Sequence, residues 1–265
     1  MRLTHLTIYP IKSLAGIPLD SARVSPQGFQ HDRRWMLIHP NGQFITARQY
    51  PNLLLMQPRF EGHHLIISSP DSSVSPLWLP LTPQRTEMVE VTIFGDQVKA
   101  QLVSREVDAW FSEQLGISCQ LVYLPDQSRR KVDPDYAEAE DMVSFADGFP
   151  YLIIGQSSLD HLNEKLDHPL SMRRFRPNLV FEGGVPHVED EWKKIQIGPI
   201  TFLPKKPCAR CVMTTFDPDT AEKGKEPLAT LSQYRQQGRK VMFGMNLLHR
   251  GEGEVKVGDH IQVLA

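Results

Sequence analysis

The sequence contains little cysteine: of 265 residues, only Cys119, Cys208 and Cys211 are cysteines. Three cysteines cannot form the disulfide framework that stabilises many small secreted domains. The chain begins with MRLTHLTIYP, which has neither the basic segment nor the apolar run of a secretory signal. We therefore expect a reducing, cytoplasmic environment.

Long apolar runs and an excess of one charge are also absent. No apolar stretch approaches the roughly 20 residues that cross a bilayer, so we expect no insertion into a membrane. The 29 basic and 31 acidic residues give a formal net charge of −2, which offers no general attraction to nucleic acid. Any binding of anions must therefore depend on a local cluster of basic residues.

Segments in which apolar and polar residues alternate recur along the chain, and this pattern predicts strands. In residues 34–48 two such segments flank Pro40-Asn41-Gly42, and an Asn-Gly pair supplies the positive φ angles of a tight hairpin turn. The same pattern predicts two further hairpins and a C-terminal strand in residues 89–103, 194–203 and 254–265.

Few segments have the period of a helix. Residues 106–115 place four apolar side chains on one face and stop at Gly116, as an amphipathic helix does. Residues 157–166 and 227–237 predict two more helices, so the expected fold is β-rich α+β. The polar residues 125–140 suggest a flexible tract, and we predict a domain boundary near residue 115, which divides the chain into residues 1–115 and 116–265.

The segment PCARCVMTT holds the pair Cys208 and Cys211. A structural zinc site usually needs a second ligand pair, which the sequence lacks. A thioredoxin-like dithiol needs a helix after the pair, whereas VMTTF predicts a strand. Two ordinary buried thiols remain an alternative. Lys205, Lys206 and Arg210 lie nearby in the sequence and favour a thiolate, which is a soft ligand for a transition metal.

Basic residues also stand beside predicted strand ends. Each alone is typical of a solvated surface charge. Together with the hydroxyl of Ser13 they indicate a phosphate site, because arginine offers forked donors and lysine a point charge. One anionic cofactor that carries a metal would account for both the thiolate and these basic residues, which are Lys12, Arg33, Arg34, Arg173, Arg174 and Arg176.

A set of motifs along the chain resembles the MOSC family of molybdenum-cofactor proteins. Within that family the similarity is to the branch of the mitochondrial amidoxime-reducing component and of the bacterial proteins that confer resistance to 6-N-hydroxylaminopurine. The resemblance implies a C-terminal MOSC β-barrel after an N-terminal β-rich MOSC-associated domain. The motifs are YPIKSLAG, DRRWMLI, FITARQYP, VSFADGFPYLI, FRPNLV, PCARCVMTTFDPDT, EPLATLSQYR, FGMNL and VKVGD.

The resemblance also implies a cofactor, Mo-molybdopterin, whose metal is bound by Cys211 as the catalytic ligand. Cys208 would then be a neighbour of that ligand. Mitochondrial relatives carry an aromatic residue at the position of Asn246, so this chain departs from their pattern there. The implied cofactor contacts are Lys12, Ser13, Arg33, Asp147, Gly148, Arg176, Asn178, Arg210 and Asn246.

The activity that the resemblance implies is two-electron reduction of N-hydroxylated bases, amidoximes and hydroxylamines, a detoxifying reaction. Some bacterial relatives continue into a ferredoxin-like domain that needs four cysteines, more than this chain has. We therefore expect a separate electron-donor protein, either a reductase or an iron-sulfur or haem carrier. The alternative is a molybdenum-cofactor carrier or sulfur-relay protein without turnover, and a zinc-stabilised β-rich interaction module is a third possibility.

Overall fold

The computed structural model describes residues 1–265. Its strands are β1 (Arg2–Ile8), β2 (Ile17–Leu19), β3 (Ser21–Ser25), β4 (Gly28–Phe29), β5 (Trp35–Ile38), β6 (Gln57–Glu61), β7 (His64–Ser68), β8 (Leu77–Pro80), β9 (Met88–Ile93), β10 (Asp96–Leu102), β11 (Gln120–Tyr123), β12 (Tyr151–Gly155), β13 (Leu179–Glu182), β14 (Ile195–Ile197), β15 (Ile200–Arg210), β16 (Gln236–Gln237), β17 (Lys240–Arg250), β18 (Glu254–Lys256) and β19 (Ile261–Val263). The helices are α1 (Arg105–Leu115), α2 (Gln156–Asn163) and α3 (Leu228–Tyr234), with 3₁₀ segments at Pro51–Leu55, Met172–Phe175, Val188–Glu191 and Val212–Thr215.

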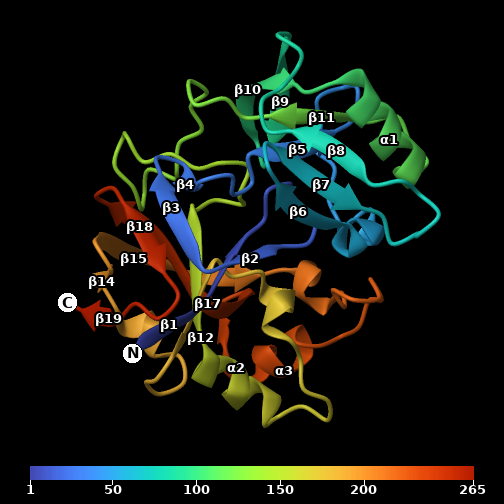
Figure 1. The fold of residues 1–265 in the computed structure, drawn as a ribbon. Coiled ribbons are helices and arrows are strands. Elements are labelled where there is room, and N and C mark those ends of the chain that lie inside the picture. Colours follow the sequence, from blue (N-terminus) through green and yellow to red (C-terminus); the bar gives the residue numbers. More distant parts are fainter.

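The strands form one large sheet and three small ones, which confirms the predicted β-rich α+β class. The large sheet has the order β19-β14-β15-β17-β12-β13-β1-β2, with β16 beside β17, and α2 and α3 pack against it (Figure 1). The small sheets have the orders β5-β11-β10-β9, β18-β3-β4 and β6-β7-β8. Strands β1 and β2, from the first 20 residues, thus pair within a sheet whose other strands all follow residue 150.

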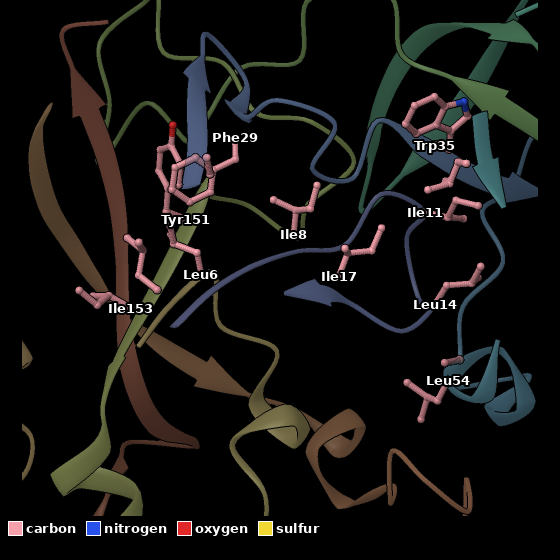
Figure 2. Close-up of a cluster of buried hydrophobic side chains, with 14 of the residues drawn as sticks. Leu6, Ile8, Ile11, Leu14, Ile17, Phe29, Trp35, Leu54, Tyr151 and Ile153 are labelled. Atoms are coloured by element: carbon pink, nitrogen blue, oxygen red, sulfur yellow. The ribbon is translucent and has the colours of Figure 1, made fainter. Parts of the chain in front are cut away.

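A single apolar cluster connects the large sheet with the N-terminal β-rich part. Figure 2 shows Leu6, Ile8 and Ile153 on the side of the large sheet, and Ile11 and Trp35 on the other side. All of these side chains are buried within one cluster of 39 residues. The first strand and the segment that follows it therefore hold the two parts together. The predicted division near residue 115 remains a prediction.

The hairpins predicted in residues 89–103 and 194–203 are present as β9–β10 and β14–β15. In residues 34–48 only the first arm is a full strand, β5, and the second arm is reduced to a bridge between Phe44 and Ile38. The chain leaves the ladder there because the Thr46 carbonyl accepts hydrogen bonds from the backbone N–H groups of Gln49 and Tyr50, which closes a turn.

The three predicted helices are present with small shifts at their ends. Helix α1 is capped by the Ser104 hydroxyl, which accepts a hydrogen bond from the Val107 N–H at 3.2 Å, and it ends at Gly116 with φ 65°. No helix in the structure is both long and apolar enough to span a membrane.

The tract 125–140, which the sequence suggested to be flexible, is largely irregular. Its buried Arg130 nevertheless donates hydrogen bonds to the carbonyls of Ser144 and Ala146.

Candidate cofactor site

The pair of cysteines lies at the end of strand β15, which two prolines shape. Pro204 and Pro207 have no N–H to give to a ladder, and proline is tolerated at strand edges and bulges. Beyond Phe202 the strand pairs with β17 alone, and its register shifts directly after each proline. Cys208 lies in the second of these bulges, and Cys211 follows the last strand residue.

The prediction of a strand for VMTTF was wrong. Val212–Thr215 is a 3₁₀ helix that begins directly after Cys211. The β-branched residues favour a strand, but the hydroxyls of Thr214 and Thr215 donate hydrogen bonds to the carbonyls of Cys211 and Val212, at 3.1 and 2.8 Å. These local bonds stabilise the turn instead. The turn leaves Cys211 exposed, whereas Cys208 is half-buried and Cys119 is buried.

One cavity gathers all ten residues that the family resemblance implied, whereas Arg34 and Arg173 do not line it. It is lined by segments that start as far apart as residues 12 and 246, which the sheet pairings bring together. Their roles toward a cofactor remain a proposal, developed below. The ten residues are Lys12, Ser13, Arg33, Asp147, Gly148, Arg176, Asn178, Arg210, Cys211 and Asn246.

Six cationic side chains and one carboxylate line this cavity, which is therefore strongly positive. The carboxylate, Asp147, lies at its mouth with its side chain 74% exposed. Loss of water in the cavity acts against its charge, but the Lys12 ammonium at 2.5 Å and nearby guanidinium groups outweigh that effect and lower the pKa of Asp147 to about 2. The cations are Lys12, Arg33, Arg48, Arg174, Arg176 and Arg210.

Several of these cations already have protein partners. Lys12 Nζ donates to the carbonyl of Phe145 at 2.8 Å as well as to Asp147. Burial lowers the pKa of Lys12, although Asp147 opposes that shift. The Arg33 guanidinium is 2.6 Å from the buried carboxylate of Asp32. Similarly, Arg174 is 2.7 Å from Asp217. These pairs stabilise the cavity wall and neutralise part of its charge.

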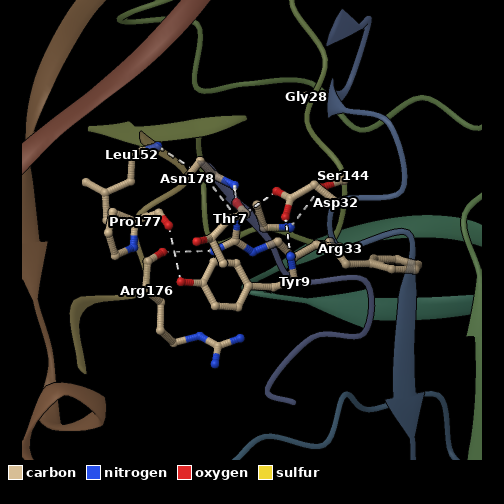
Figure 3. Close-up of polar contacts among 12 residues, drawn as sticks. Thr7, Tyr9, Gly28, Asp32, Arg33, Ser144, Leu152, Arg176, Pro177 and Asn178 are labelled. Carbon is tan, nitrogen blue, oxygen red and sulfur yellow. Dashed lines mark hydrogen bonds and ion pairs between the residues drawn. The ribbon is translucent and has the colours of Figure 1, made fainter. Parts of the chain in front are cut away.

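Arg176 differs from these paired cations, because no hydrogen bond or ion pair joins its guanidinium to another protein group. Arg48 has none either, but it is exposed, whereas Arg176 is half-buried. Figure 3 shows its side chain extending away from the network of Asp32, Arg33 and Asn178. The guanidinium lies 4.2 Å from the centre of the Tyr9 ring, and that of Arg33 lies 4.3 Å from the same ring. Burial, with Arg33 adding to it, lowers the pKa of Arg176 to about 10. A half-buried cation without a hydrogen-bond acceptor in the protein is suited to an anionic ligand.

The backbone around the cavity is strained at three of the predicted positions. Ser13, Arg33 and Arg176 have φ angles of 78°, 49° and 55°, in the left-handed region that residues other than glycine rarely adopt. Such strain tends to concentrate at ligand-binding sites, where surrounding contacts enforce it. With the uncompensated guanidinium and the exposed thiol, it makes the residues present a good fit for an anionic cofactor that carries a metal.

The cations beside the cysteine pair do not act as the sequence suggested. Lys205 and Lys206 lie outside the cavity, and Lys206 is over the Tyr136 ring at 4.1 Å. Arg210 does line the cavity, yet its Nη1 donates to Cys208 Sγ at 3.0 Å rather than to Cys211. The bulges in β15 thus place Arg210 against Cys208 and not against Cys211, its neighbour in the sequence. Cys208 therefore has a contact that helps to hold Arg210.

Two of the predicted cofactor contacts are asparagines, and the surrounding strands hold both of them in place. Both polar atoms of the Asn178 amide form hydrogen bonds: its oxygen accepts from Arg33 and from the Leu152 N–H, and its nitrogen donates to the Thr7 carbonyl. It thereby ties β1, β12 and the start of β13 together.

Asn246 lies on β17, two residues after Gly244. At Gly244 φ is 79°, and a Cβ would lie 2.6 Å from a carbon of Ile154. Only glycine allows this close packing.

Sequence reasoning missed some lining residues. Thr46 and Arg48 also line the cavity, and their signal was the motif FITARQYP, which contributed to the resemblance without being assigned a contact.

A second, larger cavity of about 820 Å³ adjoins this one and shares Arg174, Arg176 and Met213 with it. Cys211 does not line the larger cavity. The smaller one is therefore the candidate for a thiolate-bound metal.

The fold and the site together define a class: a β-rich protein with an exposed thiol in a strongly cationic cavity. Comparison with known sequences gives the family. Residues 1–118 match the model of the MOSC N-terminal beta barrel domain, and residues 140–262 match the model of the MOSC domain. The chain belongs to the family of MOSC-domain proteins, in the group that includes the amidoxime-reducing components.

Named relatives extend over nearly the whole chain. Mouse (Mus musculus) mitochondrial amidoxime-reducing component 1 is 31% identical over 99% of this chain and 82% of its own length. Human (Homo sapiens) mitochondrial amidoxime reducing component 2 is 32% identical over 98% of this chain and 82% of its own length. A molybdenum cofactor sulfurase of Oryza sativa subsp. japonica is 32% identical over 99% of this chain, which spans 35% of that relative. These matches indicate a function related to the molybdenum cofactor.

Proposed function

We propose that this protein is a molybdenum-cofactor-dependent oxidoreductase that reduces N-hydroxylated compounds, such as N-hydroxylated bases, amidoximes and hydroxylamines. The observation that carries the proposal is the exposed Cys211 thiol in a cavity with six cationic side chains. Relatives named amidoxime-reducing components, at 31% and 32% identity, support it.

In this proposal the residues of the chain hold and orient the cofactor. Cys211 gives a thiolate to the metal, since soft sulfur ligands suit transition metals. Arg176, which has no protein acceptor, binds the cofactor phosphate, and the Ser13 hydroxyl adds a hydrogen bond. Lys12 contributes once an anion competes with Asp147 for its ammonium, 2.5 Å from that carboxylate.

The bound cofactor supplies the two-electron redox chemistry by which an N–OH group, two electrons and two protons give N–H and water. Electrons come from a separate donor protein, a reductase or an iron-sulfur or haem carrier. The small N-hydroxylated substrate enters through the open mouth of the cavity, where Asp147 and Cys211 are exposed.

A second candidate is a molybdenum-cofactor carrier or sulfur-relay protein, in which Cys211 holds cofactor or sulfur without turnover. The 32% identity to a relative named molybdenum cofactor sulfurase favours it. The same thiol and the same cations serve both functions, so turnover must distinguish them.

The test begins with protein produced in a host that makes the molybdenum cofactor. Molybdenum and pterin are quantified per mole of chain, and the holoprotein is then supplied with reduced methyl viologen and either benzamidoxime or hydroxylamine. Stoichiometric cofactor with turnover supports the reductase. Cofactor without turnover supports the carrier. Stoichiometric zinc without molybdenum or pterin would reject both.

A further inference from the structure

Phe94 is both strained and exposed. It forms, with Gly95, the two-residue turn between β9 and β10. The φ angles are 50° at Phe94 and 96° at Gly95, and two positive values are what a type I′ hairpin turn requires. Asparagine or glycine is favoured at the first of these positions, whereas a bulky side chain is disfavoured. Burial does not compensate, because Phe94 is 43% exposed.

The ring lies at the rim of the cavity that contains Cys211. Lys12 Nζ is 4.9 Å from the ring centre and Arg48 Cζ is 5.6 Å from it. Both of these cations line the cavity. Phe94 is itself not one of the lining residues, so it lies just outside the space in which a cofactor would sit. The exposed part of the ring is an apolar surface beside a cationic mouth.

A second aromatic residue braces the ring. Phe44 lies 4.9 Å from Phe94 between ring centres, at an angle of 59°. Phe44 is held there because the turn before it packs on β9: the Gly42 carbonyl accepts from the Thr92 N–H at 3.0 Å, and a Cβ on Gly42 would lie 2.8 Å from the Glu90 carbonyl oxygen. Phe44 and the two cations fix the orientation of the Phe94 ring.

We propose that Phe94 is a specificity-determining residue that stacks on the planar ring of aromatic N-hydroxylated substrates at the mouth of the cavity. The inference rests on the proposed reductase function. It explains why a turn position that favours asparagine holds an exposed phenylalanine. A substrate without a ring, such as hydroxylamine, gains nothing from this contact.

The test compares Phe94→Asn and Phe94→Tyr with the wild type, as holoproteins reduced by methyl viologen so that no donor protein takes part. In Phe94→Asn we expect KM for benzamidoxime to rise about tenfold, the size of one aromatic pair contact, and KM for hydroxylamine to stay within about twofold. Phe94→Tyr, which keeps the ring, should resemble the wild type. The matched control is Trp78→Asn, which removes an aromatic residue that is 52% exposed and lines neither cavity.

Two further measurements separate this role from others. The thermal midpoint of Phe94→Asn should equal or exceed that of the wild type, because asparagine tolerates a positive φ. Its pterin content should be unchanged, because the ring acts on substrate. A lower midpoint with equal loss for both substrates, or a loss of pterin, would show a structural or cofactor-binding role and overturn the inference.

Calorimetric binding of benzamidoxime to the oxidised holoprotein gives a readout that does not need turnover. We expect about tenfold weaker binding to Phe94→Asn than to the wild type. Equal affinity of the two proteins would overturn the inference, whatever the turnover. If the wild type binds benzamidoxime through Phe94 but turns over neither substrate, the proposed reductase fails while the binding surface stands.

Discussion

Replacing Arg176 by methionine should stabilise the protein without its cofactor and weaken its hold on an anionic one. The guanidinium is half-buried without a hydrogen-bond acceptor in the protein, and its partial loss of water, with Arg33, lowers the pKa of Arg176 well below its ordinary value, to about 10. At neutral pH the Arg176 guanidinium is charged in both the folded and the unfolded state. The free energy that corresponds to the lowered pKa therefore destabilises the folded state. At about 1.4 kcal/mol per pKa unit that cost is about 3 kcal/mol.

The loss of the contact between Arg176 and the Tyr9 ring offsets about 1 kcal/mol of this gain. The net expectation is therefore that the free energy of unfolding of the apoprotein rises by about 2 kcal/mol at pH 7. Urea unfolding followed by circular dichroism measures this change. The same variant, produced in a cofactor-making host, should retain less pterin and molybdenum than the wild type.

The matched control for this experiment is Arg173→Met, in the 3₁₀ segment that ends directly before Arg176, at a residue that does not line the cavity of Cys211. The Arg173 side chain is 51% exposed and forms a surface ion pair with Asp219 at 2.7 Å. Its loss should change the free energy of unfolding by less than about 1 kcal/mol and leave pterin content unchanged. If Arg176→Met destabilises the apoprotein, or if it retains as much pterin as Arg173→Met, the reasoning from an uncompensated charge is wrong.

Three further outcomes are expected. Cys211→Ser should abolish turnover and leave the thermal midpoint unchanged, because the thiol is exposed and a hydroxyl is a poor soft ligand; full turnover would reject the ligand role. Tyr9→Leu should lower pterin content more than Tyr9→Phe, because only leucine removes the ring between two guanidinium groups; equal contents would exclude that positioning role. Burial, with Arg235, lowers the pKa of His187 to about 4, so below pH 6.5 the unfolded state binds a proton that the folded state does not. The free energy of unfolding should thus fall by about 3 kcal/mol through this group between pH 7 and pH 4, and urea titrations of His187→Asn should lack that fall; an unchanged pH dependence would contradict the assignment.

Local patterns in the sequence were sufficient for the three helices and for several of the strands. Alternation predicted β9–β10 and β14–β15, because a strand with one buried face must alternate. The absence of a second ligand pair argued against a zinc site, and the resemblance to the MOSC family singled out Cys211 as the expected ligand. Where local bonds competed with propensity, as in VMTTF, the sequence alone could not decide, because the threonine hydroxyls satisfy backbone carbonyls that a strand would use.

The identity of each side chain thus fixed what it can do: a thiol can bind a soft metal, and a guanidinium can bind a phosphate. What only the tertiary structure decided is which of these groups is free to act. Lys12 is paired with Asp147, Arg33 with Asp32 and Arg210 with Cys208, whereas the Arg176 guanidinium contacts the Tyr9 ring and has no hydrogen-bond or ion-pair partner. These pairings join residues that can lie more than 100 positions apart, as Lys12 and Asp147 do. The physical reason is that compensation of a charge depends on distance and burial, which long-range strand pairing sets and residue type does not.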